Sequence, residues 1–313
     1  MGLFGEGKRV NKPVSESMAM RSQSSLEGRP RAIGAGQNRY AGNVIWYGDY
    51  LARSNTAGGK GGAFSGKGET GNYVYSASFV VSLGETIEQV MAVSNGDDYS
   101  FFYDPPAALV DALEERGFEV TTNNTFGASF KEGTYAQTAW SYLVTAHPDQ
   151  ALPYRGEALA CFANLALGSS PVLPNFNFEV LWELNTDIAA FGPDANPADW
   201  VSEFLTNADW GASFPTALLD DFTEYQTWAR ATSLLVSPLL VGQTAANAHL
   251  MDLMQGTIAD FVWSSGVLKI IPYADKSMTG NGYTYDFDNT AIYDLDVAND
   301  DFLPCQHGPD VGT

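Results

Sequence analysis

A glycine- and lysine-rich stretch, GGKGGAFSGKGETGN, holds the residue types of a phosphate-binding loop. Gly61 and the pair Gly66-Lys67 have P-loop spacing, but Gly68 stands where the Ser or Thr that binds Mg²⁺ belongs. The same letters match the glycine fingerprint of dinucleotide-binding loops. Both motifs need a helix to follow and hold the phosphates, whereas the sequence from Asn72 onward is β-branched and aromatic. We therefore predict an open, polar loop and no cofactor.

Acidic residues are numerous, yet their spacing indicates no catalytic or metal site. The carboxylates between Asp286 and Asp301 place oxygen ligands at alternate positions, but they lack the glycine and the bidentate glutamate of an EF-hand loop. We expect them to face water and leave a Ca²⁺ site in this run open. No G-x-S-x-G, Ser-His-Asp or zinc-protease motif is present. The sequence thus predicts no catalytic, cofactor-binding or metal-binding residues.

The histidines and cysteines also favour structural roles. His147 precedes Pro148, and we expect a loop histidine that hydrogen-bonds its own backbone. His249 lies beside a helical apolar stripe, where a histidine packs more often than it binds a metal. Cys161 and Cys305 are too few for a disulfide framework or a metal cluster, so we expect synthesis in a reducing cytoplasm.

Composition predicts a globular chain with more than one core. Of the 313 residues, 45% are hydrophobic and 13% aromatic, which is enough for two domains. No run of about 18 apolar residues is present, so no membrane span is predicted. Residues 1–67 carry ten of the 16 Lys and Arg but only four of the 37 Asp and Glu, within a formal net charge of −21. An acidic main surface excludes a nonspecific nucleic-acid-binding protein.

The first half of the chain has the alternation of β-strands. The patterns NVIWYGDY and YVYSASFVVSL predict a hairpin with a long loop over residues 58–71. Asn95-Gly96 predicts a tight turn, and Asp104 a cap for a helix that ends at Gly117. The pattern FNFEV puts apolar side chains on one face and polar ones on the other, as in a strand that closes a first barrel.

The second half of the chain mixes helices with one tight hairpin. Apolar residues at helical spacing predict three helices, over residues 197–206, 221–235 and 243–255. Asn196 and Pro197 supply the cap and the first turn of the first one. Residues 258–273 predict a hairpin whose three-residue turn puts Gly266 in the left-handed conformation.

Three blocks of sequence together resemble a known family. They are the hairpin with its glycine-lysine loop, the segment AWSYLVTAHPDQALPYRGEALACFANLALGSSPVLPNFNFEV, and a third block from YQTWARATSLLVSP through FVWSSGVLKIIPYAD to GNGYTYDFDNTAIYDLDVANDDFL. In this order, from residue 28 to 303, they resemble the bacteriophage tail-tip (baseplate) hub protein family, which includes the hub proteins of gene transfer agents. Each motif is loose by itself, and the order carries the resemblance.

The resemblance implies a mixed β/α fold, predominantly β, with two barrel- or sandwich-like hub domains, a helical insertion and a helix-plus-sheet module. We expect a basic N-terminal arm over 1–27, which orders against a neighbour, and a first β hub domain over 28–185 with its insertion near 104–117. A second hub region is expected over 186–313. Hub proteins of this kind continue further, so we expect a fragment or one part of a split hub.

The resemblance also implies a structural virion protein with no enzymatic activity. It would form a homotrimeric hub that joins the tail tube or distal-tail ring to the tip and lines the DNA exit channel. Other partners would be the tape-measure protein and further tail-tip or receptor-binding proteins, and assembly would occur in the bacterial cytoplasm. The acidic surface would let DNA pass unbound, although an acidic host proteome explains the charge equally well.

An alternative function is a tail-associated cell-wall hydrolase, either a glycosidase or a peptidase. A glycosidase needs a pair of carboxylates in a cleft, for which Glu157, Glu179 and Glu183 can be nominated only arbitrarily. Trp46 and Tyr47 are expected to pack within the core or hairpin.

Basic residues near the N-terminus are predicted to contact an acidic partner ring. These predicted interface residues are Arg29, Arg31, Arg39, Lys60 and Lys67. A solvent-facing position beside the core is equally consistent with the arginines, because exposed ion pairs contribute little.

Overall fold

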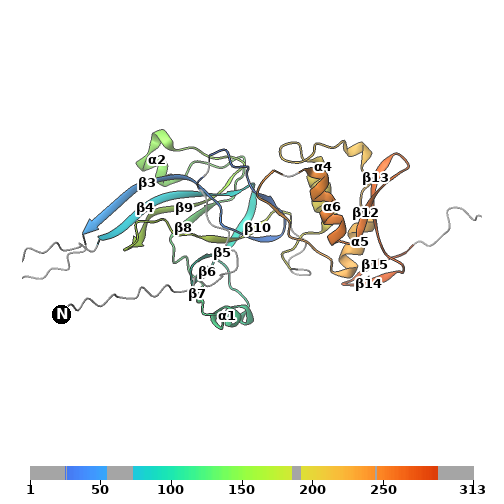
Figure 1. Ribbon diagram of the computed structural model, residues 1–313, viewed down its shortest axis with the longest axis horizontal. Coiled ribbons are helices and arrows are strands. Elements are labelled where there is room, and N and C mark those ends of the chain that lie inside the picture. Colours follow the sequence, from blue (N-terminus) through green and yellow to red (C-terminus); the bar gives the residue numbers. More distant parts are fainter. Residues whose placement is uncertain (1–24, 26, 55–72, 185–191, 244, 288–313) are drawn as a thin grey trace, which may run out of the picture.

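The computed structural model describes residues 25, 27–54, 73–184, 192–243 and 245–287, which form two packed regions (Figure 1). The N-terminal region is built mainly from strands, and the C-terminal region from helices and short hairpins. The predicted fold class, mixed β/α and predominantly β, is confirmed.

The N-terminal region is a sandwich of two sheets. The five-stranded sheet has the order β2 (Gln37–Tyr40), β10 (Asn177–Trp182), β5 (Ile87–Asn95), β6 (Asp98–Phe101) and β7 (Glu119–Thr121). The four-stranded sheet has the order β3 (Asn43–Ser54), β4 (Tyr73–Gly84), β9 (Ala158–Gly168) and β8 (Ala128–Lys131). Neighbouring strands are antiparallel except for β6 and β7, which run parallel. The antiparallel β3–β4 pair confirms the predicted long-looped hairpin.

Aromatic side chains from both sheets fill the space between them. Phe162 of β9 stacks on Phe176, which precedes β10, with ring centroids 4.7 Å apart and an interplanar angle of 2°. Phe79 of β4 stacks on Phe162 at 4.6 Å, and all three side chains are fully buried. Each such burial contributes roughly 1.5–3 kcal/mol. Phe178 and Val180 enter the same core, which confirms the alternation predicted for this strand.

The expectation that β10 closes a barrel is wrong. The strand lies inside the five-stranded sheet, between β2 and β5, and the described strands form a sandwich and no closed barrel. Its polar face is also shielded from water, because Asn177 is only 5% exposed and Glu179 accepts a hydrogen bond from Tyr99 Oη at 3.0 Å. A period-two pattern shows which residues share a face, but tertiary packing decides what covers that face.

A helical insertion follows β6, as predicted. Helix α1 (Ala107–Glu114) connects the parallel strands β6 and β7 and projects from the sandwich (Figure 1). It begins after Pro106 with no side-chain cap, so the predicted cap at Asp104 is wrong. A residue before proline avoids the helical conformation, and Pro105 followed by Pro106 therefore delays the start of the helix.

One helix of the sandwich region is missing from the sequence-based prediction. Helix α2 (Ser141–Ala146) and a 3₁₀ turn (Pro148–Gln150) cover the outer face of the four-stranded sheet. Trp140 and Leu143 pack there against Val80 of β4. A helix of six residues is too short for a periodic signal to identify it.

The C-terminal region has one core shared by helices and hairpins. Its elements are α4 (Pro197–Thr206), a 3₁₀ turn (Thr216–Leu218), α5 (Thr223–Thr232), α6 (Ala246–Gly256), the hairpin β12 (Ala259–Ser264) and β13 (Val267–Pro272), and the hairpin β14 (Met278–Gly280) and β15 (Tyr283–Tyr285). Trp200 and Tyr225 lie fully buried in this core. The expected helix-plus-sheet module is therefore present, whereas its described strands pair as two-stranded hairpins in place of a second barrel or sandwich.

Local signals predicted this region well. All three predicted helices are present, and α4 has the predicted bounds. Its start is fixed because Asn196 Oδ1 accepts a hydrogen bond from Ala198 N at 2.9 Å and Pro197 occupies the first turn. The β12–β13 turn is two residues long instead of three. Ser265 and Gly266 both have positive φ, 53° and 83°, which matches the twist of a type I′ turn.

Short backbone pairings join the two regions. Strand β1 (Ile33–Gly34) precedes the sandwich and pairs with β11 (Leu239–Leu240) of the C-terminal region. Beside it, Ala35 N donates to the carbonyl of Pro238 at 3.1 Å. The seam fixes the C-terminal region at one end of the sandwich, opposite the end where β3 and β4 project (Figure 1).

Candidate functional site

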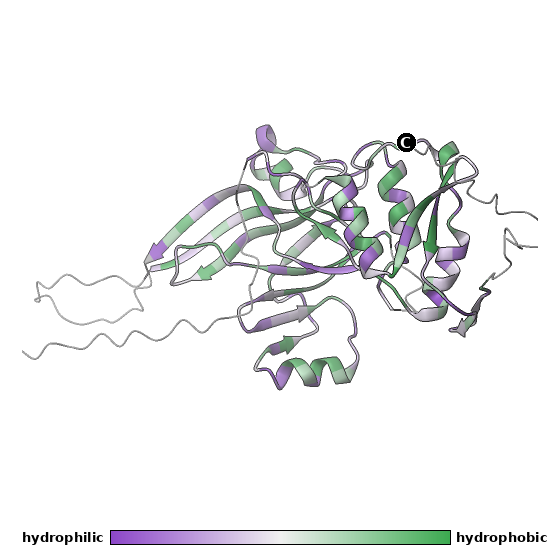
Figure 2. Cartoon of the chain, turned by 45° about the vertical axis from the view of Figure 1, so that its right-hand side comes forward, coloured by the Kyte–Doolittle hydropathy of each residue, from purple (hydrophilic) through white to green (hydrophobic). Residues whose placement is uncertain are grey.

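The far end of the four-stranded sheet extends beyond the sandwich (Figure 1), and its strands carry both hydrophobic and hydrophilic residues there (Figure 2). Strand β4 is buried along its second half but exposed where it begins, with Tyr73 46% exposed. On β3, Tyr50 is 53% exposed and its ring stacks on Tyr75 at 5.8 Å. The rings of Tyr50, Tyr73 and Tyr75 gather on one face of these two strands, and Leu51 and Val74 are exposed on the other face; we call these five residues the projecting end. Exposed aromatic patches of this kind mark interaction sites.

The residues before the projecting end differ in their packing. Trp46 packs against the α2 segment, and its Nε1 donates to Gln150 Oε1 at 2.6 Å, as expected for a packed side chain. The expectation that Tyr47 packs within the hairpin is wrong, because its side chain is 71% exposed. The loop between β3 and β4, with Lys60 and Lys67, lies outside the described residues. Their proposed contacts stay a prediction.

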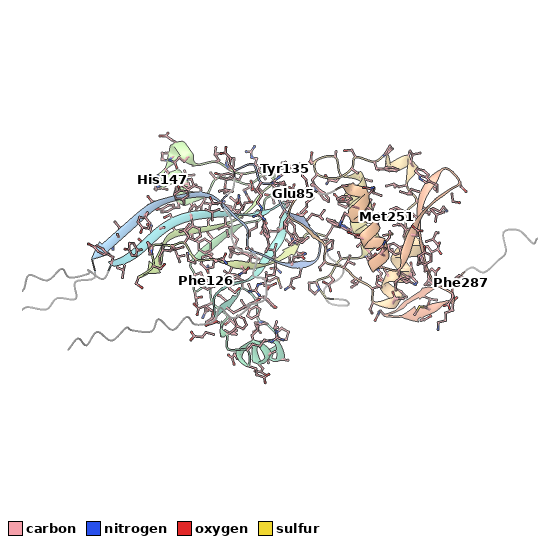
Figure 3. The ribbon with its side chains drawn as sticks, viewed as in Figure 1. Glu85, Phe126, Tyr135, His147, Met251 and Phe287 are labelled. Atoms are coloured by element: carbon pink, nitrogen blue, oxygen red, sulfur yellow. The ribbon has the colours of Figure 1, made fainter. Side chains whose placement is uncertain are left out.

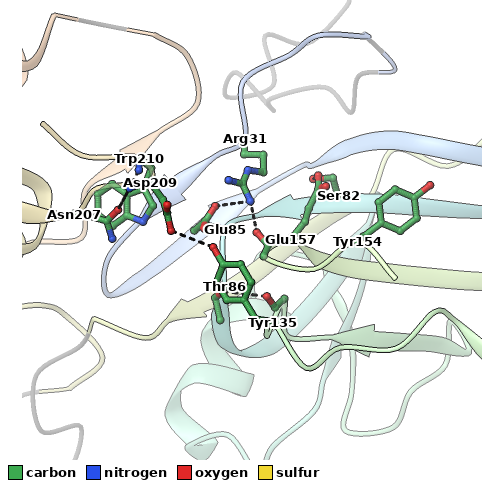
Figure 4. Close-up of polar contacts among 12 residues, drawn as sticks. Arg31, Ser82, Glu85, Thr86, Tyr135, Tyr154, Glu157, Asn207, Asp209 and Trp210 are labelled. Atoms are coloured by element: carbon green, nitrogen blue, oxygen red, sulfur yellow. Dashed lines mark hydrogen bonds and ion pairs between the residues drawn. The ribbon is translucent and has the colours of Figure 1, made fainter. Parts of the chain in front are cut away.

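Polar side chains gather where the sandwich meets the C-terminal region (Figures 3 and 4). Arg31 Nη1 lies 3.0 Å from Glu85 Oε2 and also donates to the carbonyl of Gly156. Tyr135 Oη donates to Asp209 Oδ2 at 3.2 Å, which ties the sandwich to the turn after α4. We call this group the junction cluster. Its members come from distant segments of the chain.

Burial is the main influence on the ionisation of Glu85 in the junction cluster. It raises the pKa of Glu85; the Arg31 guanidinium opposes the shift, and the carboxylates of Asp209 and Glu157 add to it. A cavity of about 400 Å³ beside Glu85 is lined by Asp209 and Glu183, among other residues. A carboxyl group with a raised pKa next to a cavity is typical of acid-base sites. Within the described residues, acid-base chemistry is best supported here.

The glutamates nominated for a hydrolase do not share one cavity. Glu179 lies within the sandwich, bonded to Tyr99, and Glu157 accepts a hydrogen bond from Ser82 Oγ. Glu183 alone of the three lines the 400 Å³ cavity. The prediction from sequence missed Glu85 and Asp209, because no local spacing connects residues that only the folded chain brings together.

Two of the three predicted interface arginines, Arg31 and Arg39, contact carboxylates of their own chain. Arg39 Nε lies 3.8 Å from Glu179 Oε1, and its Nη2 donates to Ser94 Oγ at 2.8 Å. Arg31 pairs with Glu85 as described above. Both arginine side chains remain partly exposed, and Arg29 lines a cavity of about 520 Å³ together with Arg31. Their contact with an acidic partner stays a prediction.

The two histidines that we singled out are both held by side chains. His147 Nε2 lies 3.0 Å from the carboxylate of Asp49, so the expected bond to its own backbone is wrong. Tyr142 Oη donates a hydrogen bond to the same carboxylate at 2.6 Å. This bond and the contact with His147 lower the pKa of Asp49, although partial burial acts to raise it. His249 Nε2 accepts a hydrogen bond from Trp200 Nε1 at 2.9 Å, which agrees with the predicted packing.

Other candidate chemistry is limited within the described residues. They contain no group of three or more His, Cys, Asp and Glu that could hold a metal ion. The acidic run from Asp288 to Asp301 lies outside them, as does Cys305. Cys161 is buried, and burial raises the pKa of its thiol to about 12. None of the described helices has the length and apolar character needed to span a membrane.

Comparison with known proteins identifies the fold. No protein-family model and no curated protein sequence matches the chain. Among solved structures, it is similar to a chain of the virion of a native gene transfer agent (GTA) particle, with a TM-score of 0.54 and 18% sequence identity. The match covers 82% of this chain and 55% of that chain, so the present chain spans about half the length of the structure that it matches. At this identity, the similarity establishes the shared fold.

Proposed function

We propose that this chain is a structural protein of a phage-like virion and forms the hub at the distal end of its tail. The observation that carries the proposal is the fold shared with a virion chain over 82% of the present sequence. The three sequence blocks in hub-family order support the same role. The protein would assemble in the host cytoplasm and then reside in the virion.

As a hub, the chain would form a homotrimer between the tail tube or distal-tail ring and the tip. The tape-measure protein and other tail-tip or receptor-binding proteins would be further partners. The projecting end supports an architectural role, because a ring of subunits would cover its exposed tyrosines. The net charge of −21 would keep the wall of the exit channel from binding DNA.

Labelling of purified particles tests the proposal. An antibody against this chain should mark the tail tip in electron micrographs. The double variant Y50S/Y73S should keep the thermal midpoint of the wild type, because both side chains are half-exposed, yet enter particles several-fold less often. V172S, at an exposed position outside the projecting end, is the matched control and should enter particles normally. Absence of the chain from particles would contradict the proposal.

The junction cluster keeps a cell-wall hydrolase as the second candidate function. The raised pKa of Glu85 beside a cavity is the observation in its favour. The test is whether the purified chain clears a turbid suspension of peptidoglycan. Clearing that is abolished in E85Q, but kept in the control variant E119Q at the exposed Glu119, would overturn the structural role. The hub proposal expects no clearing by either protein.

A further inference from the structure

Helix α6 contacts α4 through a hydrogen bond in which a histidine is the acceptor. Trp200 Nε1 of α4 donates to His249 Nε2 of α6 at 2.9 Å. The Trp200 side chain is fully buried, and the His249 ring also packs against Phe204 of α4, with ring centroids 5.1 Å apart. Because Nε2 accepts, the neutral imidazole carries its proton on Nδ1. This hydrogen bond therefore exists only while His249 is uncharged.

Protonation of His249 would break the contact. An imidazolium has two N–H donors and no acceptor, so two donors would face each other between the helices. The buried Trp200 N–H would lose its acceptor, and the free energy of removing that group from water would no longer be offset. Burial accordingly lowers the pKa of His249, while the charge of Asp252 on the same helix opposes the shift. Asp252 is exposed, and an exposed charge pair contributes little, so the buried contact dominates.

The carboxylates on the segment that faces the histidine are bound by other side chains. On α4, Asp199 Oδ1 accepts a hydrogen bond from Gln226 Nε2 of α5 at 2.7 Å. Glu203 Oε1, on the same helix, accepts one from Asn207 Nδ2 at 2.7 Å. In the turn after α4, Asp209 belongs to the junction cluster, where it accepts a hydrogen bond from a tyrosine. These carboxylates are thus oriented by partners other than the imidazole.

The two halves of α6 are held differently. The helix begins after Ala245, which has no side-chain oxygen to cap the first N–H groups. At the other end, Met254 is buried in the C-terminal core, and the hydroxyl of Thr257 accepts a hydrogen bond from Tyr225 Oη. The contact of His249 with α4 is therefore a polar anchor of the N-terminal half, whereas the C-terminal half is fixed by the core.

A cavity lies beside the N-terminal half of α6. It has a volume of about 420 Å³ and is lined by Ala246 of α6 together with Phe204 and Trp210, among other residues. The Trp210 ring stacks on that of Trp200, with centroids 5.9 Å apart. Movement of the first turns of α6 would therefore widen this cavity and uncover aromatic side chains.

We propose that α6 is a pH-sensitive latch: protonation of His249 releases residues 245–250 from α4 and exposes the aromatic side chains of Trp200, Phe204 and Trp210. The C-terminal half of α6 stays in place and acts as the hinge. The released imidazole is in water and binds a proton more readily than the buried one. The latch is thus closed above the pKa of the released histidine and loosens as the pH falls below it, until the lower pKa of the closed form is passed.

Amide hydrogen exchange in the full chain tests the latch. Rates measured at about pH 7.5 and about pH 5 are divided by the intrinsic rates, which gives protection factors that can be compared. In the wild type, protection across residues 249–253 should fall several-fold at the lower pH, because their N–H groups bind carbonyls of the released turns. The hairpin β12–β13 should keep its protection.

Two histidine variants show whether His249 controls the response. H249Q keeps an acceptor for Trp200 but cannot be protonated, so its protection in this stretch should not change with pH. H147Q, at the histidine of the sandwich region, is the matched control and should respond as the wild type does.

The other outcomes overturn the proposal. Unchanged protection in the wild type, or an equal fall in H249Q, would show that His249 does not control the helix. A fall shared by the whole C-terminal region would indicate general destabilisation by acid. Titration of wild-type His249 by NMR needs no variant: its pKa should lie below that of a histidine in the unfolded chain, and a value at or above it would also overturn the latch.

Discussion

Replacement of Gly84 by alanine tests how the end of β4 is joined to the segment that carries Arg31. Gly84 has a φ of +105°, and a Cβ there would lie 2.3 Å from the carbonyl oxygen of Ala32. That oxygen also accepts the 2.8 Å hydrogen bond from Glu85 N, so it cannot withdraw without losing this bond. A left-handed alanine costs about 1–2 kcal/mol, and overpacking costs about 1–3 kcal/mol more. G84A should therefore lower the free energy of unfolding by about 2–5 kcal/mol.

Gly96 offers a matched control for the conformational part of this cost. It also has positive φ, +61°, but no atom lies within 4 Å of the Cβ that alanine would add. G96A should lose only the conformational part, about 1–2 kcal/mol. Urea unfolding followed by tryptophan fluorescence measures both variants against the wild type. Equal losses in G84A and G96A would refute the reasoning, because they would show that Ala32 does not obstruct the new methyl group.

Two further substitutions probe polar contacts. Tyr225 is fully buried and its hydroxyl bonds Thr257 Oγ1, so Y225F should lose about 1 kcal/mol in urea unfolding, and an unchanged midpoint would contradict this. The hydrogen bond from the Tyr142 hydroxyl is the main reason that the pKa of Asp49 is lowered in the folded state. The ionised carboxylate therefore stabilises the fold at pH values above the unfolded-state pKa. This stabilisation is lost as the pH falls through the lower pKa of the folded state. D49N should thus lower the thermal midpoint at about pH 7 and much less at about pH 3, whereas an equal loss at both would contradict the linkage.

Elements with strong local signals could be predicted from the sequence. The Asn196 cap with Pro197 at the first turn fixes the start of α4 by backbone chemistry alone, and the predicted bounds of this helix are correct. Positive φ at Gly266 follows from a tight turn between two apolar runs, and the hairpin is present although its turn is shorter than predicted.

Features that depend on tertiary packing could not be predicted in the same way. Helix α2 has too few turns for a periodic pattern, and the tandem prolines before α1 override the capping signal of Asp104. The junction cluster joins Arg31, Glu85 and Asp209 from distant segments, so only the folded chain reveals it. The predicted contacts of Arg31 with an acidic partner compete with its pairing to Glu85, which no local pattern could indicate.

The mass of the purified chain in solution, measured alone and with the adjacent tail-ring protein, tests the hub proposal most directly. A trimer that binds the ring protein is the predicted result, because the projecting ends would then be covered by neighbouring subunits. A monomer that neither self-associates nor binds the ring protein would contradict it.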